Sequence, residues 1–377
     1  MKNLLEDKYF LFGFIWVLFT ILLLYADPPT IAQEYVASKS SVLKENSVGH
    51  SYPKGSISIT DMAGRNISLP ATPSRIACIG PGALRLIVYL EAHEKVAGVE
   101  DMEKLNPGGR PYWLATHQKF EKLPRIGPVG PAGINKKPDM EALLAVNPDL
   151  IFITYMDAGL ADEVEKTLSI PVVVLSYGAL GTFDKAVFKA MEIAGKVLDR
   201  KKRANEIIEY IEALRKDLQH RTGDIPDNQK PGVYVGGIGY RGAHGIESTE
   251  SNYIPLDWCN AINLAERIEA RIGSHIFADK EILLGLDPDV IFIDGGGLEL
   301  VIQDFHKKKK FYRALKAFRN QRIYTLLPFN FYSTNIATAL SDAYAIGKIL
   351  YPDQFKDLDV EKKGRRDIHF SCWKTGL

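Results

Sequence analysis

The chain has 377 residues, of which 46% are apolar and 25% are charged, and its formal net charge is +1. These values are typical of a soluble globular protein long enough for two domains, and the near-zero charge argues against nucleic acid as a partner. Three widely spaced cysteines without a CxxC pair indicate neither a zinc ribbon nor a disulfide framework.

The N-terminus carries an uncharged, almost wholly apolar run from Tyr9 to Ala26, preceded by Lys2 and Lys8. Its roughly 18 residues are at the lower limit for crossing a bilayer and exceed the usual core of a signal peptide. Residues 1–26 are therefore expected to be a signal peptide or membrane anchor that sends the chain to the periplasmic or extracytoplasmic side. Residues 27–55 are polar and are expected to form a linker.

From residue 56 onward, short apolar runs alternate with helical patterns, which predicts an α/β fold. An edge strand is expected at Ile57–Asp61 and buried strands at Arg75–Ile79, Val96–Val99 and Pro171–Leu175. Residues 100–127 are rich in proline, glycine and aromatic residues and are expected to form a long loop.

One stretch occurs twice. Met140–Ile153 reads MEALLAVNPDLIFI and Lys280–Ile293 reads KEILLGLDPDVIFI, with eight of fourteen positions identical and a spacing of 140 residues. Each copy predicts a short helix that ends before a Pro-Asp turn, followed by a strand buried on both faces. A period this long exceeds that of solenoid repeats and predicts two similar lobes.

Residues 183–221 have apolar residues at helical spacing and almost no proline, which predicts one helix approaching forty residues. The expected organisation is an N-terminal binding lobe (56–181), a connecting helix (182–222), a C-terminal binding lobe (231–352) and a tail (353–377). Strands at Val233–Val235 and Arg322–Leu326 and a helix at about 335–350 belong to the second lobe.

The Arg-Ile strand that ends in Gly80-Pro81, the VAGV strand, the two Pro-Asp strands and the long joining helix together resemble one family. It comprises the periplasmic substrate-binding proteins of ABC importers for iron–siderophore complexes, haem and cobalamin. The resemblance implies two Rossmann-like lobes with parallel sheets joined by one long backbone helix. It also implies capture without chemistry, so the protein is expected not to be an enzyme and to hold no intrinsic cofactor.

The ligand implied by this resemblance is an iron chelate of siderophore type, with haem or cobalamin as alternatives. Large flat chelates are held by aromatic faces, and arginine pairs with their carboxylates. Aromatic and basic residues gather in the expected strand-end loops, and the candidate ligand-binding residues are Arg110, Trp113, Tyr155, Tyr240, Arg241, His244, Phe329 and Tyr332. Only His117 and His244 offer imidazoles in those loops, so a site for a bare metal ion is not expected.

The resemblance further implies that one glutamate per lobe docks on the permease dimer, which works with its ATPase. Glu141 and Glu281 occupy equivalent positions in the repeated stretch and match that pair. Two equivalent lobes would then meet two equivalent permease subunits.

Two other interpretations remain open at this point. Residues 237–242 match GxGxxG after a predicted strand, which is the signature of an NAD-dependent oxidoreductase. The residues that follow contain Gly245, Asn252 and Pro255, which do not favour the helix that such a site requires. A sensor or adhesion domain on a membrane anchor would share the whole fold.

Overall fold

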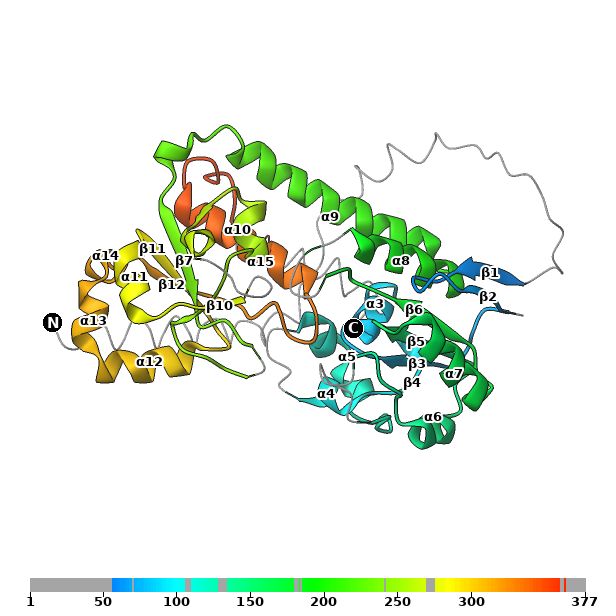
Figure 1. The fold of residues 1–377 in the computed structure, drawn as a ribbon. Helices are drawn as coiled ribbons and strands as arrows, with labels where there is room; N and C mark the ends of the chain where they lie inside the picture. Colours follow the sequence, from blue (N-terminus) through cyan, green and yellow to red (C-terminus); the bar gives the residue numbers. More distant parts are fainter. Residues whose placement is uncertain are drawn as a thin grey trace. The chain divides into compact units, whose positions relative to one another are not determined.

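The computed structural model describes residues 56–69, 71–105, 110–127, 134–179, 183, 185–240, 242–268, 275–359 and 363. The expected anchor (1–26), the linker (27–55) and most of the tail lie outside the described residues. Within the described part, no helix is both long and apolar enough to cross a bilayer. Two separate four-stranded parallel sheets carry the fold, with helices packed around each of them (Figure 1).

The first sheet has the order β4-β3-β5-β6, with every neighbouring pair parallel. We call the half of the chain built on it the N-terminal lobe. Its elements are β1 (Ile57–Thr60), β2 (Asn66–Leu69), β3 (Ile76–Ile79), α3 (Ala83–Tyr89), η1 (His93–Lys95), β4 (Val96–Gly98), α4 (Asp101–Lys104), α5 (Pro111–Phe120), α6 (Met140–Val146), β5 (Leu150–Thr154), α7 (Ala158–Leu168) and β6 (Val172–Leu175). β1 and β2 form a separate antiparallel hairpin.

The second sheet has the order β12-β11-β7-β9 and is also parallel. We call the half built on it the C-terminal lobe. Its elements are β7 (Gly232–Gly236), β8 (Ser248–Glu250), α10 (Ile254–Trp258), β9 (Ile262–Asn263), η4 (Leu264–Arg267), β10 (His275–Phe277), α11 (Lys280–Leu286), β11 (Val290–Asp294), α12 (Leu298–Lys307), α13 (Lys309–Ala314), α14 (Lys316–Arg319), β12 (Ile323–Leu326) and α15 (Ile336–Leu350). β8 and β10 pair antiparallel outside this sheet.

The repeated stretch forms the predicted helix, turn and buried strand in both lobes, as α6–β5 and α11–β11. Each helix ends at a residue in the left-handed conformation, Asn147 (φ 44°) and Asp287 (φ 36°), directly before the buried proline. The two Pro-Asp strands lie in different sheets, as the two-lobe prediction requires.

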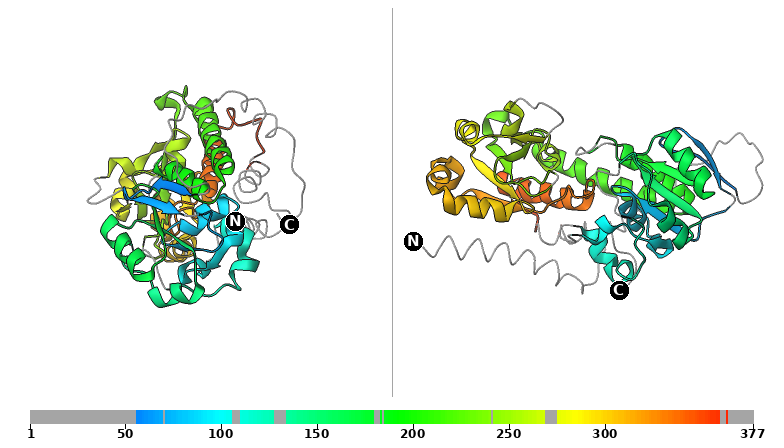
Figure 2. Two further views of the ribbon diagram at one scale, coloured as in Figure 1. Left: turned by 90° about the vertical axis from the view of Figure 1, so that its right-hand side faces the viewer. Right: turned by 60° about the horizontal axis from the view of Figure 1, so that its bottom comes forward.

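The predicted single helix over residues 183–221 is wrong in its extent. The structure has two helices, α8 (Ala186–Val197) and α9 (Lys201–Thr222), separated by a turn in which Asp199 is left-handed (φ 58°) and the Arg200 N–H donates to the Gly195 carbonyl at 2.7 Å. Of these two helices, α9 is the one that connects the lobes. It packs on α8 at one end and on α10 and α15 at the other (Figures 1 and 2).

One apolar cluster runs through both lobes beneath α8, α9 and α15. It contains one face of each sheet, for example Cys78 and Phe152 in the first and Val235 and Phe292 in the second. The opposite face of each sheet belongs to a cluster of its own. Burial on both faces explains why the strands are continuous runs of apolar residues. The shared cluster makes α9 part of the core.

Residues 100–127, predicted to be a loop, contain α4 and α5. Pro111 stands at the first position of α5, where its missing N–H costs no hydrogen bond. The helix is buried along most of its length, and Tyr112, Trp113 and Phe120 face the core.

Candidate functional site

The two sheets share one strand order. In each lobe, numbered by appearance in the chain, the order is second, first, third, fourth: β4-β3-β5-β6 and β9-β7-β11-β12. The chain segments that follow β3 and β5 therefore run to opposite sides of the first sheet, and those that follow β7 and β11 run to opposite sides of the second. In open parallel sheets, ligands bind outside the carboxyl ends of two adjacent strands whose connections diverge in this way. The fold thus places a candidate site at the ends of these four strands.

In the N-terminal lobe, this point is formed by Gly80 after β3 and Tyr155 after β5. Gly80 has φ 90°, and a Cβ there would lie 2.6 Å from the Thr154 hydroxyl, so only glycine fits. Tyr155 has φ 59°, a strained conformation for an aromatic residue. Backbone strain of this kind concentrates at functional positions, and here it aims the residue directly beyond a buried strand.

Buried charges lie next to this point. The Glu100 carboxylate, which follows β4, accepts hydrogen bonds from the Gly80 N–H at 3.0 Å and from the Tyr332 hydroxyl at 2.7 Å. Burial raises the pKa of Glu100 to about 8, although both hydrogen bonds oppose that rise. Glu103 is fully buried and pairs with Arg110 at 2.9 Å. Burial raises the pKa of Glu103 as well, against the attraction of Arg110.

A segment of the C-terminal lobe, residues 329–335 between β12 and α15, reaches these charges. The fully buried Arg85 on α3 donates to the carbonyls of Phe331, Tyr332 and Thr334 at 3.1, 3.0 and 2.8 Å. The Arg110 guanidinium lies 4.9 Å from the centre of the Phe331 ring. Tyr332 and Ser333 are left-handed, with φ of 53° and 71°. The N-terminal lobe therefore holds this segment in a strained conformation through charged side chains.

In the C-terminal lobe, the ends of β7 and β11 meet where Gly297 contacts Gly237 and His244. A Cβ at Gly297 would overlap the carbonyl oxygens of Gly237 and His244. The loop after β7 and the turn after β11 consequently pack backbone against backbone. Asp294, the last residue of β11, is buried beside this contact, and its carboxylate accepts from the Gly296 N–H at 2.8 Å.

Three buried carboxyl groups gather near this contact: Glu250, Asp294 and Asp342. Burial raises the pKa of Glu250 to about 8 and of Asp294 to about 7, and raises that of Asp342 well above its usual range. The negative charge of Asp294 adds to the rise for both other groups. Among the described residues, no group of three His, Cys, Asp or Glu side chains has the arrangement of a metal site.

An aromatic cluster lies on the loop after β7 and on β10. Tyr240 stacks on His275 with ring centres 4.3 Å apart, and Phe277 packs edge-on against His244 at 5.0 Å. Tyr240 is 45% exposed and Phe277 57% exposed. We call Tyr240, His244, His275 and Phe277 the aromatic cluster.

Hydrogen bonds fix the tautomers of its two histidines. His244 Nε2 lies 2.7 Å from the Tyr240 carbonyl, which can only accept, so Nε2 carries the proton. His275 Nε2 lies 2.8 Å from the Ser248 hydroxyl, which already donates to the Ile238 carbonyl, so this Nε2 also donates. In the neutral form of either ring, Nδ1 would then be the acceptor. Burial lowers the pKa of His275, and His244 lowers it further.

The structure places the predicted site residues in two groups. Arg110, Trp113 and Tyr332 lie buried around the Glu100–Glu103 charges, with Arg110 5.6 Å from the Trp113 ring. Tyr240 and His244 lie together in the aromatic cluster. Phe329 is buried against Tyr253, Tyr155 follows β5 and packs against the shared apolar cluster, and Arg241 lies outside the described residues. Ligand contact by these residues stays a prediction.

Sequence reasoning missed the buried charges. Glu100 and Asp294 each end a buried apolar strand, and a polar residue at the carboxyl end of such a strand is a recognisable signal. Arg85 also follows the end of a buried strand, β3, whereas Glu250 and Asp342 lie on β8 and α15, where the sequence gives no such signal.

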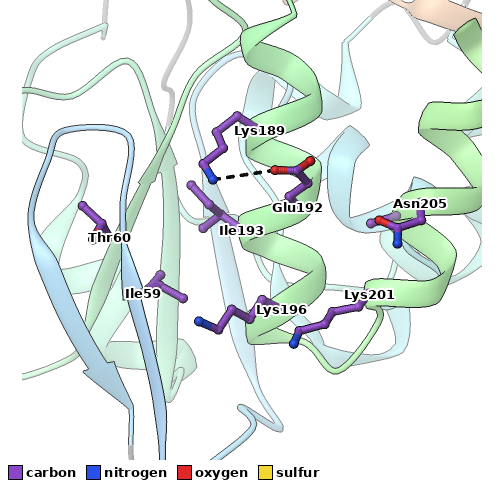
Figure 3. Close-up of a pocket in the computed structure, with 9 residues that line it drawn as sticks. Ile59, Thr60, Lys189, Glu192, Ile193, Lys196, Lys201 and Asn205 are labelled. Carbon is purple, nitrogen blue, oxygen red and sulfur yellow. Dashed lines mark ion pairs between the residues drawn. The ribbon is translucent and has the colours of Figure 1, made fainter. Parts of the chain in front are cut away.

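A surface groove lies away from these strand ends, between β1 and the α8–α9 pair (Figure 3). Its basic side chains are Lys189, Lys196 and Lys201. Lys189 lies 3.6 Å from Glu192, and Lys196 donates to the Ser58 carbonyl at 2.6 Å. None of the predicted site residues lines it. The groove is therefore a feature of the helix–hairpin junction and separate from the candidate site.

The GxGxxG match at residues 237–242 leads into β8, a strand paired with β10, and not into a helix. A dinucleotide site needs a helix N-terminus at that position to hold the pyrophosphate. The surroundings of the motif therefore contradict the oxidoreductase interpretation.

The chain is similar to the molybdate-binding protein MolA of Haemophilus influenzae, with 23% identity over 326 residues that cover 81% of this chain and 87% of MolA. The solved structure of MolA bound to molybdate has a TM-score of 0.65 at 20% identity and covers 85% of this chain and 98% of that chain. CeuE of Helicobacter pylori with Ni(II) bound has a TM-score of 0.60 at 15% identity, covering 85% and 97%. At these identities the solved structures establish the fold.

The sequence model of the family described as periplasmic binding protein matches residues 76–328, more than half of the chain. This confirms the resemblance stated above at the level of family and fold. Such proteins bind substrates for ABC transporters and are not enzymes. This chain belongs to the periplasmic binding protein family and is a substrate-binding protein of an ABC transporter.

Proposed function

We propose that the chain captures an iron chelate of siderophore type between its two lobes and delivers it to the permease of an ABC importer. The observation that carries this proposal is the aromatic cluster on the loop after β7. Two of its rings, Tyr240 and Phe277, are about half exposed, although burial of such rings is strongly favourable. Exposed aromatic faces next to a strand-end site suit the flat rings of a chelate, and haem or cobalamin would use the same surface.

Burial makes the three carboxyl groups of the C-terminal lobe hard to ionise near neutral pH, because it raises the pKa of Glu250 to about 8, that of Asp294 to about 7 and that of Asp342 well above its usual range. Glu250, Asp294 and Asp342 carry no compensating ion pair among the described residues, so any that ionise create negative potential on their side of the site. This potential would act against molybdate, the ligand of the relative MolA, and equally against an iron(III) tris-catecholate, since both are anions, so the aromatic cluster and not charge favours the chelate.

Binding can be tested with four probes: an iron(III) tris-catecholate, haemin, cyanocobalamin and sodium molybdate. Quenching of tryptophan fluorescence should give the tightest binding for the iron chelate. Tyr240→Ala and Phe277→Ala should each weaken that binding about tenfold, while Leu300→Ala, an exposed residue on α12, should leave it unchanged. Tight binding of molybdate alone would overturn the proposed ligand class.

Delivery is proposed to use Glu141 on α6 and Glu281 on α11, both exposed. Charge reversal of both, Glu141→Lys with Glu281→Lys, should abolish transport and leave ligand affinity intact. Normal transport by this double variant would remove the docking assignment. In this proposal residues 1–26 carry the chain across the membrane and, if kept, tether it there.

A further inference from the structure

Beside each proposed docking glutamate, an exposed leucine occupies the same position of the repeat. We propose that Leu144 and Leu284, with Glu141 and Glu281, form a duplicated acidic–apolar face that contacts the two equivalent subunits of a permease dimer. This inference rests on the proposed function and adds an apolar contact to each docking site. The face comprises Glu141, Leu144 and Ala145 on α6 and Glu281, Leu284 and Gly285 on α11.

The two helices are anchored to their sheets in the same way. Asp139 caps α6 by accepting from the Ala142 N–H at 3.0 Å, and Asp279 caps α11 by accepting from the Ile282 N–H at 2.8 Å. After each helix, an aspartate carboxylate accepts from the backbone at the start of the neighbouring strand. Asp149 takes the Ser74 N–H at 2.7 Å, and Asp289 takes the Gly232 N–H at 2.8 Å. Each helix therefore presents the same side outward from its lobe.

Whether a leucine of the repeat is buried or exposed depends on its position in the repeat, and the pattern is the same in both copies. Leu143 and Leu283, one residue earlier, are fully buried, whereas Leu144 is 52% exposed and Leu284 40% exposed. Few large apolar residues are this exposed in the described part of the chain, and these two fall on one repeat position. An exposed leucine gains free energy when a partner covers it.

The rest of the face fits a close protein contact. Glutamate, leucine and the next residue stand at i, i+3 and i+4, which places them on one side of a helix. Ala145 and Gly285 are exposed and small, and nothing lies within 4 Å of a Cβ built at Gly285. A partner surface can therefore approach the backbone next to each leucine.

Charge and duplication identify the occupant. Among the described residues neither glutamate is ion-paired, so each face presents a free carboxylate to a basic partner. The same face occurs once in each of two lobes with one strand order. A partner made of two identical subunits offers two identical acceptor surfaces, as a permease dimer does. Contact between two copies of this chain is the competing occupant.

The test compares the wild type with variants of the full chain for binding to the cognate permease–ATPase complex, reconstituted in lipid nanodiscs. The double variant Leu144→Gln with Leu284→Gln should bind roughly tenfold more weakly than the wild type, with ligand affinity and thermal stability unchanged. Leu300→Gln with Ile302→Gln, two exposed apolar residues of α12 outside the repeat, should bind as the wild type does. Each single leucine variant should show part of the loss.

The outcomes separate the two proposals. Wild-type binding by the leucine double variant, together with lost binding by Glu141→Lys with Glu281→Lys, overturns this inference and leaves the proposed function standing. If both double variants bind normally, the docking role itself fails. If sedimentation shows a wild-type dimer that the leucine variant dissolves, the face belongs to a second copy of this chain and the inference is overturned.

Discussion

Replacing Glu250 with glutamine should make the protein more stable in mild alkali and not in mild acid. Glu250 ends β8, is only 5% exposed and lies near Asp294. Burial raises its pKa to about 8 from an ordinary value of 4.5. The unfolded chain releases this proton near pH 4.5, whereas the folded chain keeps it until about pH 8. Between these values the folded state binds more protons, so stability falls as pH rises.

The size of the effect follows from that difference. A folded-state pKa of about 8 against an unfolded-state value of 4.5 lowers the free energy of unfolding by about 5 kcal/mol once the pH is above 8. Glu250→Gln removes this cost but buries an amide whose hydrogen bonds are incompletely met, at about 1–3 kcal/mol. We therefore expect a net gain of about 2–4 kcal/mol at pH 8.5 and a loss of about 1–3 kcal/mol at pH 5, where the acid is already neutral.

Urea unfolding followed by circular dichroism at pH 5 and pH 8.5 measures both values. Glu209→Gln, on the exposed side of α9, is the matched control and should change stability by less than about 0.5 kcal/mol at either pH. The decisive quantity is the difference between the two pH values, which does not depend on how well glutamine packs. An equal effect of Glu250→Gln at pH 5 and pH 8.5 would refute the reasoning from buried charge.

Four further predictions concern the lobe contact and glycine packing. Arg85→Met leaves three carbonyls without their guanidinium donor and should cost about 3 kcal/mol or more in urea unfolding; a cost below 1 kcal/mol would contradict this. Tyr332→Phe removes a hydrogen bond that favours the ionised form of Glu100 and so lowers its pKa. The free energy of unfolding should fall by about 1 kcal/mol at pH 6 and by more above pH 8, where Glu100 is ionised. Equal losses at the two pH values would count against this prediction. Gly297→Ala forces a methyl group onto two backbone oxygens and should lower the stability of the fold by about 1–3 kcal/mol. Gly285→Ala meets open space within α11 and should raise the stability by about 0.5 kcal/mol. Thermal melts that gave the opposite order would contradict both predictions.

The repeated stretch and the apolar strands were predictable because their information is local. Leu150–Thr154 and Val290–Asp294 are short runs of branched residues after a Pro-Asp turn, and both formed the expected strands. The break between α8 and α9 was not predictable in this way. No proline or glycine stands in the turn at Leu198–Arg200, and the chain turns there because α9 packs back on Gly195. A Cβ at Gly195 would lie 2.9 Å from the Ala204 Cβ.

The candidate site was predictable only in part. Position after a strand identified the loops, which is why Tyr155, Tyr240 and Tyr332 lie at or near strand ends. The direction in which each side chain points could not be predicted from the sequence, because it depends on tertiary packing. Trp113 points into the core since α5 is a helix, and Arg110 is occupied by Glu103. The half-buried ring of His275 and the exposed ring of Phe277 join Tyr240 only through the pairing of β10 with β8.

The hold of Arg85 on residues 331–334 has a consequence for the transport cycle. Separating the two lobes at this point would break three hydrogen bonds that the charged Arg85 donates, each worth about 1.5–3 kcal/mol. Thermal motion seldom supplies that much, so a ligand bound between the lobes, as proposed, would be released only slowly by wide opening alone. In the proposed function, the energy for unloading then comes from the transporter and its ATPase.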